Sequence, residues 1–576
     1  MSNITSMITK ARAIRTTEGQ GDHLAIEALA GTGKTTTLVV GLAYIFRDSS
    51  PDLWEKMKKK IGFDPLASAT PQQIQIWEAL AEPYQEGEPL PRTITYVAFN
   101  KSIVNEFSEK WSWLVKDLGS LGISLSFSTC HSLGFAACRK GLGLKPWGSV
   151  NQWRTRDILE GILGRTWKEW TKSAENMITA KAVEALVQHA KTSLVDTTPE
   201  ELDHLANHFG IEMSDPARTF DLVNQVIEIS LDDPQEVDYS DQLFLPLALD
   251  LPVFRSDLLL GDEAQDWNKA QQGLLLKAAR RAVICGDTNQ AIYGFAGADV
   301  DSIPSMVQKL GETRKVQVLP LTVTRRCGKA IVQEARKIVP TFEAHPSNQD
   351  GQVIHLGSEK AFSMIGESDM VLSRTNAPLV SWAFRLIKSG KKANIQGRDI
   401  GQGLISLVDK ISKGKIRKSE WSVAYLIDGI ETWAEGEARK IEKMKRPSEE
   451  AMIALKDRRD CLLAFCQDAI DIPEVKANIQ ATFQGMICPE CGKSFNEGAT
   501  QCWEKSHKGT KLVKPEGTLL SSIHRSKGLE ASRVFLLHPE LLPHPMAKTA
   551  WARGQESNLE YVAKTRAIDS LVIVQE

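Results

Sequence analysis

A phosphate-binding loop near the N-terminus constrains this 576-residue chain more than any other feature. The run Ala28-Leu-Ala-Gly-Thr-Gly-Lys-Thr35 lies between an apolar, strand-forming run and a helix-forming run. Small residues let backbone N–H groups wrap a phosphate chain, and the N-terminus of the following helix adds positive charge. We expect Lys34 to contact the β- and γ-phosphates and the Thr35 hydroxyl to bind Mg²⁺. The loop residues predicted to hold the nucleotide are Ala30, Gly31, Thr32, Gly33, Lys34, Thr35 and Thr36.

Composition and charge exclude several classes of protein. The chain has 42% apolar and 25% charged residues, and no apolar run approaches the roughly 18 residues of a membrane span. The first fifteen residues lack an apolar signal core, so we expect a cytoplasmic protein without membrane contact. Its net charge of −2 restricts any nucleic-acid surface to a local patch.

Short apolar, β-rich runs recur along the chain, with helix-length segments between them. Several are nearly continuous apolar strings, which is typical of parallel strands covered on both faces. The alternation indicates βαβ units, and therefore an α/β fold class. The predicted strands are His23–Leu29, Thr93–Phe99, Ser124–Ser128, Asp257–Leu260, Ala282–Cys285, Val316–Leu321, Gln352–Leu356, Met370–Ser373, Leu519–Ile523, Val534–Leu537 and Leu571–Val574.

The strands fall into two sets, which predicts two α/β cores, each with a mostly helical insertion. The predicted boundaries are 1–140 and 241–315 for the first core, 141–240 for its insertion, 316–400 and 516–576 for the second core, and 401–515 for its insertion.

An acidic pair follows one of the buried strands. Asp262 and Glu263 come directly after Leu258-Leu-Leu-Gly, so the strand delivers two adjacent carboxylates to one edge of the sheet. We expect Asp262 to hold Mg²⁺ through water and Glu263 to polarise the water that attacks the γ-phosphate. Acidic pairs at strand ends are often only solvated, but a phosphate loop upstream favours the catalytic interpretation.

Taken together, these runs resemble the UvrD/Rep-like branch of the superfamily 1 helicases. The acidic run continues to Asp266, and Gly286-Asp-Thr-Asn-Gln290 opens a further motif of that family. The resemblance spans Ala28 to Ala567, and it is specific because independent accidents would have to fall in the family's order. The other matching motifs are Ala98–Lys101, Thr129–Gly134, Leu321–Arg326, Val371–Asn376, Ser522–Glu530 and Gln555–Ala567.

The resemblance implies two RecA-like phosphate-loop NTPase cores that use ATP and Mg²⁺. Gln290 would sense the γ-phosphate or the attacking water. Arg326 and Arg566, from the second core, would reach the γ-phosphate, a role that suits the planar and permanently charged guanidinium. Glu530 would contact the nucleotide sugar, and Arg325 would stack on the base where the family often has an aromatic residue.

The resemblance also implies single-stranded DNA, and a junction of single- and double-stranded DNA, as partners. Such a track needs aromatic platforms for the bases and polar groups for the backbone. Each of these side chains alone could equally be core packing. The predicted DNA contacts are Phe99, Asn100, His131 and Phe295 on the first core, and Arg374, Asn376, Ser522 and His524 on the second.

The glutamine that relatives place before the phosphate loop to recognise adenine has no clear counterpart. Gln20 is the only one near enough, and the expected pattern around it is absent. The run Thr70–Gln73 is more similar, but it follows the loop and belongs to a segment that interrupts the first core.

A cysteine cluster lies in the second insertion. Cys488 and Cys491 are two residues apart, and Cys502 and His507 follow, which is the ligand set and spacing of a structural zinc site. Free cysteines in a loop are the alternative. The lysines beside the cluster are either solvated charge or a small duplex-gripping surface.

The sequence therefore predicts an ATP-dependent DNA helicase that moves 3′→5′, a direction implied by the family branch rather than by residue chemistry. The alternative is a single-stranded DNA translocase that removes bound proteins with little unwinding. A small-molecule kinase or a nucleotide switch is a third hypothesis, but it leaves the later motifs unexplained. RNA as the track stays open, and the compact length suits a phage or mobile-element protein.

Overall fold

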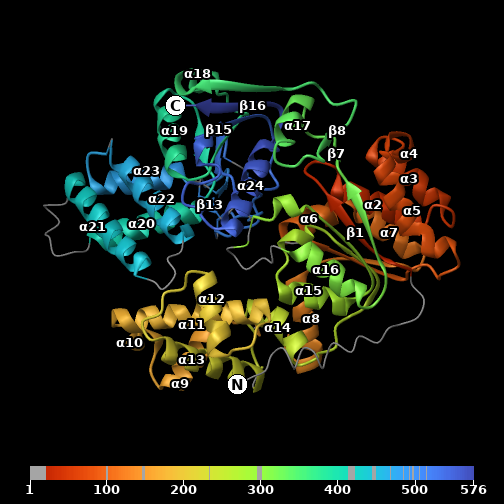
Figure 1. Cartoon of the computed structure of the whole chain (residues 1–576), viewed down its shortest axis with the longest axis horizontal. Helices are drawn as coiled ribbons and strands as arrows, with labels where there is room; N and C mark the ends of the chain where they lie inside the picture. Colours follow the sequence, from red (N-terminus) through yellow and green to blue (C-terminus); the bar gives the residue numbers. More distant parts are fainter. Residues whose placement is uncertain are drawn as a thin grey trace. The chain divides into compact units, whose positions relative to one another are not determined.

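The computed structural model describes residues 21–575, apart from residues 99–100, 146–148, 233, 293, 295–300, 413–421, 444–448, 468, 484, 492, 496–498, 505 and 514 and the side chains of residues 102, 106 and 450. The chain forms two compact units, Met1–Val323 and Thr324–Glu576 (Figure 1). No helix in the described ranges is both long enough and apolar enough to cross a membrane.

The first unit is built on a six-stranded sheet in which every neighbouring pair is parallel, in the order β3-β2-β4-β5-β1-β6. The strand that precedes the phosphate loop, β1, lies between β5 and the edge strand β6 and is almost fully buried, so the loop leaves the carboxyl edge of the sheet from a fixed position. The strands are β1 (His23–Ala28), β2 (Thr93–Ala98), β3 (Ser124–Thr129), β4 (Ser256–Gly261), β5 (Ala279–Gly286) and β6 (Val316–Leu321).

Helices cover both faces of this sheet, as the apolar strands require. Along β1, Leu24 and Ile26 face one layer and Ala25 faces the other. The first layer contains α2 (Lys34–Ile45), α3 (Pro51–Ile61), α4 (Pro65–Ser68), α5 (Pro71–Gln85), α6 (Lys101–Lys110) and α7 (Ser112–Ser120). The opposite layer contains α8 (Cys130–Leu142), α15 (Lys269–Ala278) and α16 (Ser302–Gly311).

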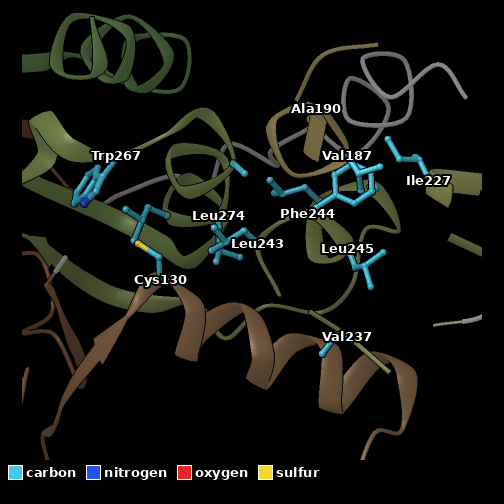
Figure 2. Packing of buried hydrophobic residues seen from close by; sticks show 14 of the residues in the cluster. Cys130, Val187, Ala190, Ile227, Val237, Leu243, Phe244, Leu245, Trp267 and Leu274 are labelled. Atoms are coloured by element: carbon cyan, nitrogen blue, oxygen red, sulfur yellow. The ribbon is translucent and has the colours of Figure 1, made fainter. Parts of the chain in front are cut away.

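The helical insertion of the first unit shares its core with the second of these layers. Cys130 and Leu274 from the core helices, and Val187, Leu243 and Phe244 from the insertion, belong to one apolar cluster (Figure 2). The insertion is therefore held to the sheet by a continuous core. Its helices are α9 (Arg154–Leu163), α10 (Trp167–Trp170), α11 (Ala174–Ser193), α12 (Pro199–His208), α13 (Pro216–Asp232) and α14 (Tyr239–Ala248).

A buried ion network fixes the insertion internally. The carboxylate of Asp241 accepts hydrogen bonds from Lys191 Nζ at 2.7 Å and from Arg154 Nη1 at 2.5 Å. All three side chains are buried, and both cations also bond to Ser230. Burial opposes ionisation of Asp241, but Lys191 and Arg154 outweigh it and lower the pKa of this carboxyl.

The second unit repeats the design with a six-stranded parallel sheet, in the order β11-β14-β10-β15-β16-β9. A two-stranded sheet of β7 (Val323–Thr324) and β8 (Glu343–Ala344) accompanies it. The six strands are β9 (Gln352–Gly357), β10 (Met370–Ser373), β11 (Ala393–Ile395), β14 (Thr518–Ser522), β15 (Ala531–Leu537) and β16 (Ala567–Gln575). The helices outside the insertion are α17 (Lys329–Ala335), α18 (Ser358–Met364), α19 (Ala377–Lys388), the short η5 (Pro539–Leu541) and α24 (Ala550–Lys564).

The insertion of the second unit also packs on its sheet, but its last part has a core of its own. Four helices share the apolar cluster of the sheet: α20 (Arg398–Ser412), α21 (Val423–Glu442), α22 (Glu449–Cys466) and α23 (Ile472–Thr482). A short antiparallel pair follows, β12 (Met486–Ile487) and β13 (Ser494–Phe495). Cys488, Phe495, Cys502 and Leu512 form a separate small cluster there.

The structure confirms the predicted α/β class, and every predicted strand coincides with a parallel strand. One predicted boundary is wrong: residue 316 does not begin the second core, because β6 pairs with β1 in the first sheet. The division falls between Val323 and Thr324. Strand β11 was missed, because three residues at a sheet edge give too short an apolar run.

We predict that Asp241→Asn weakens the insertion strongly, because it leaves Lys191 and Arg154 as buried charges with a neutral partner. Hydrogen–deuterium exchange of α11 and α14 should report a local opening free energy lower by about 3 kcal/mol. Asp221→Asn is the control, since Asp221 is exposed and bonds only Gln225 in the described structure. Equal exchange in both variants would contradict a stabilising network.

The lowered pKa of Asp241 also predicts how the stability of the insertion depends on pH. Because the pKa of Asp241 is lowered in the folded state, its contribution is present above the unfolded value of about 4 and is lost as the pH falls through the folded value.

Candidate functional site

The phosphate loop has the backbone shape that its glycines predict. Gly31 and Gly33 adopt φ angles of 66° and 82°, a left-handed conformation that other residues rarely accept. Gly33 caps α2, which begins at Lys34, so N–H groups of the first helical turn face the loop. The Thr32 hydroxyl donates to the Leu29 carbonyl at 2.9 Å and closes the loop on itself.

Thr35 and Asp262 meet where a magnesium ion would be expected. The Thr35 hydroxyl donates to Asp262 Oδ2 at 2.7 Å, and the Tyr96 hydroxyl donates to the same oxygen at 2.6 Å. Burial raises the pKa of Asp262, and Glu263 raises it further. A hydroxyl and a carboxylate are hard oxygen ligands of the kind that Mg²⁺ prefers, so Thr35 and Asp262 fit the ion.

Lys34 lies against the second carboxylate. Its Nζ donates to Glu263 Oε2 at 3.3 Å. Burial disfavours the lysine cation, but Glu263, Asp287 and Asp262 outweigh that effect and raise its pKa. The ammonium group is therefore charged at neutral pH and surrounded by acids that an incoming phosphate chain could replace.

The backbone at Glu263 is strained, and a glutamine holds its side chain. Glu263 adopts a φ of 56°, which costs a non-glycine residue of the order of 1 kcal/mol. Gln265, in the short helix η1 (Ala264–Asp266), donates to Glu263 Oε2 at 2.5 Å and accepts from the Asp287 N–H at 3.0 Å. A Cβ on Gly286 would lie 2.4 Å from Gln265 Oε1, so only glycine permits this bridge between the two strand ends.

Gln290 belongs to the same constellation. It lies in the short helix η2 (Thr288–Gln290), is 5% exposed, and donates to Asp287 Oδ2 at 2.6 Å. Burial raises the pKa of Asp287, while Lys34 and the amide of Gln290 favour its charged form. The carboxyl edges of β1, β4 and β5 thus bring Lys34, Glu263 and Gln290 together as the sequence predicted.

Sequence reasoning missed several supporting residues. Tyr96 lies on β2 and has no motif of its own, and Gln265 and Asp287 occur inside motifs without an assigned role. The helix α5, which follows the phosphate loop in the sequence, packs on α2, and Gln73 donates to the Thr37 hydroxyl at 3.1 Å. Its neighbour Gln72 accepts from the Thr322 N–H at 2.9 Å. The capping pattern Thr70-x-x-Gln73 was the available signal for that helix.

In the second unit, three residues predicted to serve the nucleotide come together from distant motifs. Arg326 Nε donates to Glu530 Oε2 at 2.6 Å. Arg566 is buried and donates to the carbonyls of Val562 at 3.0 Å and Leu529 at 3.1 Å. Arg325, which directly precedes Arg326 in the sequence, is exposed.

The predicted DNA contacts of the second unit lie in a polar network. Arg374 makes a buried two-pronged ion pair with Glu556, at 2.9 and 2.7 Å. Asn376 donates through its backbone and its side chain to Asp457, at 2.7 Å each. Burial and the charge of Arg374 lower the pKa of His524 to about 3, so its ring is neutral at neutral pH.

Ser522 is nearly buried at the end of β14. In the first unit, His131 stands at the start of α8 with its ring edge-on to Tyr239. Phe99, Asn100, Phe295 and Gln20 lie outside the described residues. The DNA-contacting roles of all these side chains stay predictions.

Three of the four predicted zinc ligands come together. The sulfur atoms of Cys488, Cys491 and Cys502 all lie within 4.8 Å of one another, with Cys491 and Cys502 at 4.0 Å. His507 is outside this group, and its Nδ1 instead bonds Glu490 Oε2 at 2.6 Å.

Two family models match the chain. The UvrD/REP helicase N-terminal domain matches residues 76–310, and the UvrD-like helicase C-terminal domain matches residues 496–576. The chain belongs to the UvrD/Rep-like helicase family. The first match begins after the phosphate loop, so in this family member the loop is identified by its own residues and geometry.

Curated relatives agree with the family models. The ATP-dependent DNA helicase PcrA of Staphylococcus aureus is 23% identical over 368 residues, which cover 60% of this chain and 42% of the relative. PcrA of Staphylococcus epidermidis is 22% identical over 345 residues, which cover 57% of this chain and 39% of the relative. This UvrD/Rep-like chain thus matches about two fifths of the length of these relatives.

We predict that Tyr96→Phe weakens the binding of Mg²⁺ with nucleotide, because Asp262 loses the phenol that orients it. Loss of such an outer partner typically costs 10- to 100-fold in metal affinity. Titration of Mg²⁺ into the chain with ADP, followed by calorimetry, measures the change. Tyr44→Phe is the control, since Tyr44 lies ten residues along α2 from Lys34. An unchanged Mg²⁺ affinity would show that the phenol does not position Asp262.

Proposed function

We propose that this chain is an ATP- and Mg²⁺-dependent DNA helicase that translocates 3′→5′ on single-stranded DNA. The observation that carries the proposal is the cluster of Lys34, Thr35, Asp262, Glu263 and Gln290 at one edge of the first sheet, in a member of the UvrD/Rep-like family. This cluster contains one group for each task in phosphoryl transfer: neutralising the phosphate charge, binding Mg²⁺, orienting the attacking water and sensing the γ-phosphate.

In the first unit, the ion pair between Lys34 and Glu263 acts as a substrate-controlled switch. The triphosphate of ATP draws the Lys34 ammonium away from Glu263, and Glu263 becomes free to orient the attacking water. Gln265 keeps the Glu263 carboxylate in position during this exchange. Thr35 and Asp262 would hold Mg²⁺, which would neutralise negative charge on the phosphate oxygens.

The second unit contributes cations to the same reaction in this proposal. Arg326 leaves Glu530 for the γ-phosphate, and Arg566 stabilises the charge that develops there. Glu530, once released, is available to the sugar, and Arg325 to the base. Approach of the two units with ATP, and separation after hydrolysis, would move the DNA strand between successive grips.

In this proposal the predicted DNA-contacting side chains of both units bind the single strand. The substrate is a junction of single- and double-stranded DNA. PcrA, a DNA helicase by name, supports DNA as the track, and the family branch supports 3′→5′ movement. The alternative is a translocase that strips proteins from single strands with little unwinding. The two share one hydrolytic site and differ only in strand release.

We predict that ATP hydrolysis is stimulated by single-stranded DNA and depends on both residues of the switch. Lys34→Ala should abolish nucleotide binding and hydrolysis. Glu263→Gln should keep nucleotide binding and lower kcat by about 10²- to 10⁴-fold, since only the water-orienting carboxylate is lost. Phosphate release and mant-ATP binding measure the two effects. Hydrolysis indifferent to DNA would contradict the helicase and favour a kinase or a switch.

Strand displacement on the same preparation separates the helicase from the alternative. A duplex with a 3′ tail should be unwound, and one with a 5′ tail should not. Release of streptavidin from a biotinylated single strand without duplex unwinding would favour the translocase.

We also propose a structural zinc ion bound by Cys488, Cys491 and Cys502. Tetrahedral coordination with bonds of about 2.3 Å places sulfur atoms about 3.8 Å apart, close to the 4.0 Å between Cys491 and Cys502. His507 would complete the site through Nε2, which its bond to Glu490 leaves available. Its Nδ1 bond to Glu490 is the outer carboxylate contact that typically orients a zinc-bound histidine.

We predict one zinc ion per purified chain, measured by plasma mass spectrometry. Cys488→Ser should remove it, and Glu490→Gln should weaken zinc retention by about 10- to 100-fold against a chelator. Cys466→Ser is the control, since Cys466 is buried in α22 outside the cluster. A zinc-free chain with a Cys491–Cys502 disulfide would overturn the site.

A further inference from the structure

The helix α5 connects the phosphate loop to the segment that leaves the first unit. It lies beside α2, the helix that begins at Lys34 (Figure 1), and it also packs against β6, the strand that ends at Leu321. Thr322 and Val323 follow β6, and the second unit begins at Thr324. One helix therefore contacts both the start of the nucleotide site and the last residues before the second unit.

The contact between α5 and α2 is close, and it is polar near the start of α2. Gln73 Nε2 donates to the Thr37 hydroxyl at 3.1 Å, and Trp77 Nε1 donates to the Thr37 carbonyl at 2.9 Å. Thr37 is fully buried and lies three residues after Lys34. A Cβ at Gly41 would lie 2.9 Å from the Trp77 ring, so the missing side chain lets the two helices pack closely.

Gln72 bonds the segment that leaves the first unit. The Thr322 N–H donates to Gln72 Oε1 at 2.9 Å, and Gln72 Nε2 donates to the Thr322 hydroxyl at 2.9 Å. Thr322 is 9% exposed, so water competes little for these bonds. The N–H of Leu29, in the phosphate loop, donates to the Leu321 carbonyl at 2.9 Å. The chain at residues 321–322 is thus bonded to the phosphate loop directly and also through α5.

The first turn of α5 is fixed, which gives the Gln72 side chain a defined position. The helix begins at Pro71, and Thr70 and Gln73 form a reciprocal capping box around it. The capping box uses the side chains of Thr70 and Gln73 and leaves the Gln72 amide to Thr322. The two bonds to Thr322 therefore join a rigid helix start to the end of a buried strand.

The turn that carries Arg326 follows Thr322 almost immediately. Asn348 Nδ2 donates to the carbonyls of Thr324 and Cys327 at 2.9 Å each, which bridges the two ends of this turn. The Arg326 N–H also donates to the Thr324 hydroxyl at 3.2 Å. A single residue separates Thr324 from Thr322. A displacement of Thr322 is consequently passed to a turn that moves as one piece.

We propose that Gln72 is a positioning residue for ATP hydrolysis, because its bonds to Thr322 set where Arg326 stands when the phosphate loop is occupied. The inference rests on the proposed function, which assigns Arg326 to the γ-phosphate. Gln72 acts through Thr322 and not on the nucleotide. Without the two bonds the guanidinium would sample more positions, and the rate of a positioned reaction falls steeply with such misplacement.

The first test separates nucleotide binding from turnover. Gln72→Ala should lower kcat of hydrolysis stimulated by single-stranded DNA about tenfold and leave the Kd for mant-ATP nearly unchanged, since the phosphate loop is intact. Gln72→Glu keeps an acceptor for the Thr322 N–H and hydroxyl, so it should recover most of kcat. Gln75→Ala is the matched control, because Gln75 is exposed on the same helix, and it should behave as the wild type.

A double-mutant cycle with Arg326→Ala separates positioning from simple stabilisation. If Gln72 acts through Arg326, Gln72→Ala should change kcat less than about twofold once Arg326 is alanine. A purely structural role would lower kcat by the same factor in both backgrounds.

Three results would overturn this role of Gln72: equal factors in both backgrounds, an unchanged kcat in Gln72→Ala, or weaker mant-ATP binding in that variant. DNA-stimulated hydrolysis by the wild type would leave the proposed function standing in each case. Wild-type hydrolysis that is indifferent to DNA would instead overturn the function, and the role of Gln72 with it.

Discussion

The contact of Lys34 with a pair of adjacent carboxylates is the interaction around which the first unit is organised. Parallel strands bring their carboxyl ends to one edge, so a loop after β1 and an acidic pair after β4 meet although more than two hundred residues separate them. Burial disfavours the charged forms of both Lys34 and Asp262; the surrounding acids outweigh it for Lys34 and raise its pKa, whereas Glu263 adds to it for Asp262. The site is consequently poised to exchange one anionic partner for another.

Both insertions extend the cores that carry the chemistry. In the first unit, the apolar cluster runs from the sheet through α8 and α15 into α11 and α14 (Figure 2). In the second, Asp457 of α22 accepts from the N–H groups that begin α19, directly after the motif residues Arg374 and Asn376. An insertion packed in this way places new surfaces at fixed positions beside the motifs of the core. The cysteine element, with a core of its own, is the exception.

Strands and loop chemistry were predictable because they depend on local signals. Apolar runs gave the strands, and Gly31, Gly33 and Lys34 gave the loop, since each signal is contained in a few neighbouring residues. The partner of each charged side chain was not predictable in the same way. Arg374 was assigned to DNA, yet its guanidinium meets Glu556, which lies 182 residues later in the chain. His507 likewise bonds Glu490 through Nδ1, a partner that the cysteine spacing does not indicate.

The sequence by itself determined which chemical groups this protein has and in what order: a phosphate loop, an acidic pair, a sensing glutamine, two motif arginines and a cysteine set. Only the tertiary structure decided which sheet β6 joins, that Tyr96 bonds Asp262, and that Gln265 bridges Glu263 to Asp287. The physical reason is that strand pairing, burial and ion pairing depend on residues far apart in the chain. A local sequence pattern does not specify which distant residue becomes the partner.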